Sequence, residues 1–238
     1  MSNEDILTLN SNVSMHASFQ DYIQQIMNAH DIEQFAYFVA NKRAINEPQI
    51  FSNYPKKWLK VYKERNLHMQ DPIINFAFNS IIPFSWSDAI LNISAKEKYF
   101  LNQAEKYYLN DGYSFTLHDA NGNFAALSIG NPRNSEKFSH LINAQKPNLQ
   151  MLLIEIHHDY LSNYFNLITQ NILKDKQITK REKEILIWCS KGKTYNEISI
   201  IIGITERTVK FHMANLVKKL NVCNAKHAIF KAHELNLI

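Results

Sequence analysis

The chain has few cysteines and no long hydrophobic run. Only two of its 238 residues are cysteines. Cys189 and Cys223 have no Cys or His neighbours at metal-ligand spacing, which argues against zinc and against a disulfide framework, and we interpret both as packing residues. No run of 18 apolar residues occurs, and the start MSNEDILTL lacks the basic and apolar regions of a signal peptide. We therefore expect a soluble cytoplasmic protein without a membrane partner.

Signatures of catalysis are missing as well. The sequence contains no nucleophile elbow, P-loop or zinc-hydrolase motif. His157, His158 and the other histidines have neither metal-ligand spacing nor a partner motif. We expect no catalytic residues, no metal, no cofactor and hence no enzyme.

Charge is distributed unevenly along the chain. Residues 171–238 contain 13 Lys+Arg and 6 Asp+Glu, a net charge of +7, whereas residues 1–170 contain 13 and 16, a net charge of −3. The length allows two ordinary domains. A basic back half beside a mildly acidic front half predicts that one domain binds nucleic acid and the other does not.

The stretch EISIIIGITERTVKFHMANLVKKL, residues 197–220, predicts two short helices. Ile198, Ile201 and Ile202 recur at helical spacing, Gly203 breaks the period, and Thr205 begins a second helix whose apolar face is Val209, Met213, Leu216, Val217 and Leu220. Such a helix-turn-helix would offer cations and amides to DNA. The alternative is the solvated polar face of an ordinary three-helix domain. The DNA-binding candidates are Lys193, Thr194, Thr205, Arg207, Thr208, Lys210, His212, Asn215 and Lys218.

Two more helices complete the back half. Thr179 and Glu182 have the spacing of a capping box, which predicts a helix from Lys180 to about Ser190 that stops at Gly192. A last helix is expected over about 224–235. We expect a four-helix all-α domain over 177–238, preceded by a linker over 165–176.

The front half, residues 1–164, predicts an α+β fold. We expect a loose arm over 1–16, strands at 34–40, 49–53, 113–119 and 124–130, and a loop at 83–86. Helices are expected over about 19–30, 55–66, 72–81, 95–109 and 135–164, with Pro147 starting, kinking or interrupting the last. Helices flanking an antiparallel sheet give an α-β-α sandwich.

The back half resembles the DNA-binding domain of the LuxR-type quorum-sensing regulators. The run TKREKEILIWCSKGKTYNEISIIIGITERTVKFHMANLVKKLNV carries this resemblance. Three positions typical of the family fall on Glu182, Leu186 and Gly192. Glu182 can be explained as a helix cap, Leu186 as a core residue and Gly192 as a helix end. These roles are structural, whether or not the domain binds DNA.

The front half is similar to the family's acyl-homoserine-lactone receptors, and the segment NYPKKWLKVYKERNLHMQDP has their spacing without a gap. Six positions that recur around the ligand pocket of these receptors fall on Trp58, Tyr62, Asp71, Pro72, Trp86 and Gly112. Singly, a Trp and a Tyr four residues apart are usually core, and an Asp before Pro is usually a helix cap. Their joint presence beside the DNA-binding motif favours a lactone pocket.

The chemistry of a homoserine lactone assigns a role to each group. The indole N–H of Trp58 suits the ring carbonyl, the Asp71 carboxylate suits the amide N–H, and the hydroxyls of Tyr62 and Ser128 suit the amide carbonyl. Trp86 would be a wall, and Gly112 is interpreted as backbone geometry. The candidates to line the acyl tail are Tyr54, Ala36, Phe38, Leu101, Phe115 and Ala126.

The resemblance implies a homodimer on a pseudo-palindromic operator in double-stranded DNA, with the helix after Ser135 and the final helix as dimer contacts. The segments GYSFTLHDANGNFAALSI and LQMLLIEIH look most similar to the enterobacterial branch, whose members can bind DNA without ligand and release it with ligand. Ligand-released repression is therefore favoured. Ligand-dependent activation, with RNA polymerase as a further partner, and a ligand-blind DNA-binding regulator stay open. Acyl-chain length and operator sequence are undefined.

Overall fold

The computed structural model describes residues 3–42, 45, 48–133, 136–165, 178–235 and 237–238. The chain divides into two compact units, Met1–Ser162 and Asn163–Ile238. Except for its first residue, the predicted linker over 165–176 lies outside the described residues.

Unit 1 is built on one five-stranded antiparallel sheet with strand order β2-β1-β5-β4-β3. The strands are β1 (Gln34–Asn41), β2 (Gln49–Ser52), β3 (Phe84–Ser85), β4 (Gly112–His118) and β5 (Asn123–Gly130). The two-residue strand β3 lies in the segment predicted to be a loop. It was missed because two residues carry no alternation pattern.

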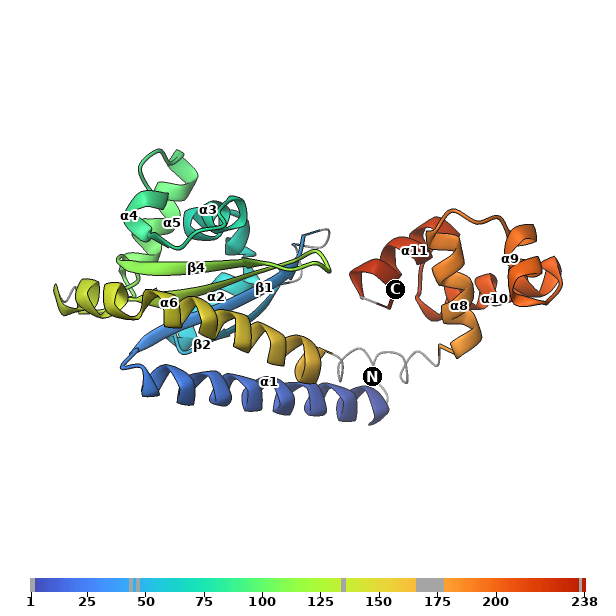
Figure 1. Cartoon of the computed structure of the whole chain (residues 1–238), viewed down its shortest axis with the longest axis horizontal. Helices are drawn as coiled ribbons and strands as arrows, with labels where there is room; N and C mark the ends of the chain where they lie inside the picture. Colours follow the sequence, from blue (N-terminus) through green and yellow to red (C-terminus); the bar gives the residue numbers. More distant parts are fainter. Residues whose placement is uncertain (1–2, 43–44, 46–47, 134–135, 166–177, 236) are drawn as a thin grey trace. The chain divides into compact units, whose positions relative to one another are not determined.

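Helices cover both faces of the sheet, as the α-β-α sandwich requires (Figure 1). One face carries α2 (Lys56–Glu64), α3 (Pro72–Asn79), α4 (Trp86–Ala89) and α5 (Ala95–Glu105), and the other carries α1 (Asn3–Ala29) and α6 (Glu136–Asp159). A 3₁₀ turn, Leu67–Met69, precedes α3, and a π-helical turn, Tyr160–Phe165, follows α6.

Several helix limits differ from the predictions; α2, α5 and α6 end two to five residues earlier than expected. The arm expected over 1–16 is helical from Asn3, because no Gly or Pro between there and Ala29 interrupts α1. Helix α3 ends at Asn79, so Ile81 lies beyond it and is 83% exposed. Pro147 lies within α6, which is assigned as one helix across it.

The sheet separates two apolar layers by strict alternation. Along β1, Ala36 and Phe38 point to the α2–α5 side, where Phe38 packs with Trp58. Tyr37 points to the other side, where its ring lies 6.4 Å from Phe19 of α1. Because successive strand residues face opposite ways, each position in the sheet belongs to only one of the two layers.

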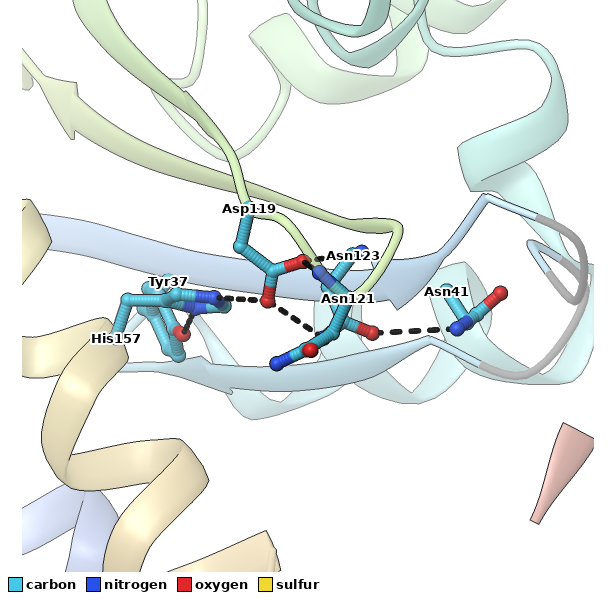
Figure 2. A network of polar contacts seen from close by, with 6 residues as sticks. All are labelled: Tyr37, Asn41, Asp119, Asn121, Asn123 and His157. Atoms are coloured by element: carbon cyan, nitrogen blue, oxygen red, sulfur yellow. Dashed lines mark hydrogen bonds and ion pairs between the residues drawn. The ribbon is translucent and has the colours of Figure 1, made fainter. Parts of the chain in front are cut away.

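A buried polar chain links the sheet to α6 on the α1–α6 side (Figure 2). Tyr37 Oη lies 2.8 Å from His157 Nδ1, and His157 Nε2 lies 3.1 Å from Asp119 Oδ2. Burial raises the pKa of Asp119, but hydrogen bonds from Asn123 and His157 outweigh it and hold the pKa below its usual value. The ionised carboxylate only accepts, so Nε2–H of a neutral His157 donates to Asp119, and the Tyr37 hydroxyl donates to Nδ1.

Replacing Tyr37 by phenylalanine should therefore destabilise unit 1. The change leaves the buried Nδ1 of His157 without a donor, at a cost of about 1–3 kcal/mol in the free energy of unfolding. Urea denaturation would measure it. Tyr22→Phe is the matched control, since Tyr22 donates to Asp159 of the same helix from a site that is 38% exposed. If Tyr22→Phe lost as much unfolding free energy as Tyr37→Phe, burial would not explain the importance of the Tyr37 hydrogen bond.

Unit 2 has four helices in its described residues, α8 (Lys180–Ser190), α9 (Tyr195–Ile202), α10 (Glu206–Lys219) and α11 (Ala225–Glu234). The predicted capping box of Thr179 and Glu182 is present, and Gly203 ends α9 with a φ of 67°. Thr205 caps α10 by accepting from the Thr208 backbone N–H. The helix-turn-helix prediction is confirmed.

Candidate ligand pocket and nucleic-acid interface

Unit 1 contains a cavity of about 240 Å³ between the sheet and helices α2–α5. Most of its walls are apolar, and the polar atoms come from a few side chains. Nine predicted site residues line it: Ala36, Phe38, Tyr54, Trp58, Tyr62, Asp71, Trp86, Leu101 and Ser128.

Asp71 is a buried carboxyl group that lines the cavity, and hydrogen bonds from its own chain fix its position. As the N-cap of α3, its Oδ1 accepts from the backbone N–H groups of Ile73 (2.9 Å) and Ile74 (3.4 Å). Its Oδ2 accepts from the Tyr62 hydroxyl at 2.8 Å. Burial raises the pKa of Asp71 to about 6, although these three hydrogen bonds oppose the rise. Asp71 thus caps α3, as predicted, and also lines the cavity.

The Tyr54 hydroxyl, which lines the cavity, has no partner within the described part of the chain. The Tyr54 hydroxyl is buried and unbonded, and burial, followed by the charge of Asp71, raises its pKa. The Trp58 indole also lines the cavity; Trp58 is only 3% exposed, and its ring lies 5.8 Å from that of Tyr62. Tyr54, assigned to the tail by sequence, is therefore an available hydrogen-bond donor, whereas Tyr62 already donates to Asp71.

A second polar chain fixes the opposite wall. The Trp86 indole N–H donates to Ser114 Oγ at 2.9 Å, and Ser114 Oγ lies 2.8 Å from Ser128 Oγ. The sequence reasoning missed Ser114. Its position directly across the hairpin from Ser128 could have revealed it once the register was known.

Four predicted ligand residues lie outside the cavity lining. Phe115 pairs with Leu127 and so faces the α1–α6 side of the sheet, one residue out of phase with the pocket face; that assignment was wrong. Ala126 faces the correct side but packs beside Phe38 in the core. Pro72 is the first residue of α3.

Gly112 leaves no room for a side chain, which agrees with its interpretation as a residue required by backbone geometry. A Cβ at this position would lie 2.4 Å from the Ile129 carbonyl oxygen and 2.7 Å from two ring atoms of Trp86. Only glycine lets the Trp86 ring lie against the start of β4.

The remaining lining residues were not predicted. They are Ile50, Leu59, Ile73, Ile74, Ile90, Phe100, Asn102, Ala104, Glu105, Leu109 and Asn110. Several come from the buried side of α5, where Phe100 and Ala104 recur four residues apart. That spacing identifies a core-facing side but not a cavity beside it.

In unit 2, the predicted DNA-binding residues fall into three groups. Arg207, Lys210 and Lys218 are exposed on α10, whereas Thr208, His212 and Asn215 are half-buried. Thr194 and Thr205 cap helices, and Lys193 lies 3.0 Å from Glu197. Three cations on the outer face of the second helix are the groups best placed to meet phosphates and base edges.

Within the described residues, no group of three or more His, Cys, Asp or Glu side chains could hold a metal ion. None of the helices searched there is both long and apolar enough to cross a bilayer.

Comparison with known proteins matches both units. Residues 16–160 match the autoinducer binding domain, and residues 176–232 match the bacterial regulatory proteins of the luxR family. The transcriptional activator protein ExpR of Dickeya dadantii is 42% identical over 96% of this chain and 94% of its own length. EsaR of Pantoea stewartii subsp. stewartii, also named a transcriptional activator protein, is 34% identical over 95% and 94%.

Solved structures support the fold. A crystal structure of Escherichia coli SdiA superposes with a TM-score of 0.68 at 24% identity, covering 97% of this chain and 98% of that one. With the cavity in unit 1 and the helix-turn-helix in unit 2, the family matches settle the class of protein. The chain belongs to the LuxR family of autoinducer-binding, DNA-binding transcriptional regulators.

Proposed function

We propose that the cavity of unit 1 binds an N-acyl-homoserine lactone and that this controls how a homodimer holds a pseudo-palindromic DNA site. One observation carries the proposal: an apolar cavity in which an acceptor, Asp71, lies with the unpaired hydroxyl of Tyr54 and the indole of Trp58. A homoserine lactone offers the complementary set, one amide N–H and two carbonyl oxygens, attached to an apolar tail.

The hydrogen bonds of the structure refine the expected roles. Asp71 accepts the amide N–H with a carboxylate oxygen, and the Trp58 indole donates to the ring carbonyl. The amide carbonyl is better served by the Tyr54 hydroxyl than by that of Tyr62, which donates to Asp71 at 2.8 Å. Ser128 supports the same carbonyl from the sheet, and Trp86 forms the wall for the ring.

Lactone affinity should fall at acid pH. The ligand amide N–H donates to ionised Asp71, so binding favours the deprotonated form of a carboxyl whose pKa is about 6. Below that pKa, binding must release a proton, and affinity should drop by up to about tenfold per pH unit. Titration calorimetry on either side of the pKa would measure the drop. Asp71→Asn should have a flat profile, and a profile like that of the wild type would contradict the assignment.

A dimer is proposed because one helix-turn-helix covers only a half-site. Apolar side chains remain exposed on the two helices expected to form dimer contacts. Met151 and Ile154, three residues apart on α6, are 53% and 41% exposed, and Phe230 of α11 is 52% exposed. A second copy of the chain would bury both faces.

For the direction of the switch, we favour ligand-released repression. Asp71 already accepts hydrogen bonds from three donors of its own chain, so unit 1 does not need a ligand to supply hydrogen bonds to this buried carboxyl. The front-half segments that resemble the ligand-released branch support the same direction. Ligand-dependent activation, with RNA polymerase as a partner, is the alternative that the names of the ExpR and EsaR relatives favour.

A gel shift tests ligand, DNA and direction together. The full-length protein would be mixed with duplexes selected from a random library, with and without a panel of acyl-homoserine lactones. We expect a dimer-sized complex without lactone that is lost as lactone is added. Complex formation only with lactone would support activation instead, and indifference to every lactone would contradict the proposal.

DNA binding should depend steeply on salt, and Lys210→Ala should lower that dependence. The side chain of Lys210 is 60% exposed, and its Nζ lies 2.6 Å from Glu206 of the same helix. Because an exposed ion pair of this kind is weak, the lysine can turn to a phosphate and displace one counterion per half-site. Its loss should reduce the slope of log affinity against log salt by about 1 per half-site. Lys60→Ala is the matched control, because it removes the same charge from an exposed position in unit 1. Equal salt slopes for the wild type, Lys210→Ala and Lys60→Ala would exclude a contact between Lys210 and phosphate.

A further inference from the structure

The outer face of α10 carries two apolar side chains among its cations. The exposed residues of this helix are Arg207, Lys210, Phe211, Ala214 and Lys218. Positions 207, 211, 214 and 218 are four, three and four residues apart and therefore form one stripe along the helix. Along this stripe the side chains are, in order, a cation, an aromatic ring, a methyl group and a second cation.

Phe211 is the large member of this stripe. It is 62% exposed, and the ring of His212 lies beside it, with centroids 5.9 Å apart. Single exposed apolar residues are ordinary on protein surfaces. The position of Phe211 is not ordinary, because this is the helix face that a helix-turn-helix places in the major groove. Phe211 also lies in the second turn of α10, in the half that contacts base edges.

The chemistry of the two side chains limits what they can recognise. Neither Phe211 nor Ala214 has a hydrogen-bond donor or acceptor, so neither can read the polar edge of a base. The one apolar group that base pairs present in the major groove is the C5-methyl group of thymine. Phenylalanine and alanine are among the side chains suited to contact it.

We propose that Phe211, assisted by Ala214, reads thymine methyl groups in each half-site and is a specificity-determining residue of DNA binding. Arg207 and Lys218, one turn before and one turn after this apolar pair, meet guanine edges or phosphates on either side. The half-site then contains at least one thymine between the positions that these cations contact. This inference rests on the DNA-binding function of the family and is independent of the ligand.

The test is a thymine-to-uracil scan. The full-length protein selects its site from a random duplex library, and each thymine is then replaced singly by uracil, which differs only in lacking the methyl group. Affinity is measured for the wild type, Phe211→Ala and Lys210→Ala in whichever ligand state binds DNA. At one or two positions per half-site, uracil should weaken wild-type binding by about fourfold, the effect of burying one methyl group.

The variants separate the contact from general effects. Phe211→Ala should bind thymine and uracil duplexes equally at those positions, whereas Lys210→Ala should bind both more weakly and keep the fourfold ratio. If Phe211→Ala binds too weakly to measure, Phe211→Leu should show a reduced ratio. A wild type insensitive to every replacement, or a Phe211 variant that keeps the full ratio, would overturn the proposal. An equal loss on all duplexes in Phe211→Ala would instead assign the ring to a contact with protein.

Discussion

Asp71→Ala should reduce lactone affinity by one to two orders of magnitude, because it removes the acceptor for the ligand amide N–H. A hydrogen bond to a charged group contributes about 1.5–3 kcal/mol. The same substitution removes the N-cap of α3 and leaves the Tyr62 hydroxyl unpaired, so the free energy of unfolding should also fall by about 1 kcal/mol or more.

Asp71→Asn separates these two effects. Asparagine is as good an N-cap as aspartate, so stability should be nearly retained. Its amide cannot replace the charged acceptor, so lactone affinity should still fall. Calorimetric titration gives the affinity, and urea denaturation gives the stability. Wild-type lactone affinity in Asp71→Asn would show that this carboxylate does not hold the amide.

Gly112→Ala should give the largest loss of stability among the pocket substitutions, about 1–3 kcal/mol for a forced overpacking. The added Cβ would meet the Ile129 carbonyl at 2.4 Å, and a backbone atom cannot move aside as a flexible side chain can. It would also press on Trp86, whose indole holds Ser114, so lactone affinity should fall with stability.

Gly130→Ala is the matched control, because Gly130 pairs with Gly112 across the same two strands. The nearest atom to its added Cβ is the Gln34 side-chain oxygen at 2.7 Å, which can rotate away. Urea denaturation should therefore show a smaller loss for Gly130→Ala. Equal losses in the two variants would mean that the close approach to Trp86 is not what requires glycine.

Features set by neighbours in sequence were predictable. The capping box of Thr179 and Glu182, the glycine that ends α9 and the Asp71 cap all depend on residues within three or four positions of each other. The Trp58 and Tyr62 pair on one helical face was predictable for the same reason, and their rings are indeed adjacent.

Features that depend on pairing between residues distant in the sequence could not be predicted. Phe115 was assigned to the wrong face because a shift of one residue in a strand exchanges the two faces, and only the pairing with Leu127 fixes the phase. Tyr62 donates to Asp71 and leaves the Tyr54 hydroxyl free for a ligand. The sequence could not show this, because the Tyr62–Asp71 contact spans the turn between α2 and α3. The role of Ser114 likewise depends on the Trp86 ring across β3 and β4.

The most direct measurement is a calorimetric titration of the full-length protein with acyl-homoserine lactones at two temperatures. The account predicts saturable binding of one lactone per chain with a negative heat-capacity change, because the acyl tail leaves water for the apolar cavity beside Asp71 and Trp58. Absence of binding for every lactone, or binding of equal strength to homoserine lactone without its acyl tail, would contradict it.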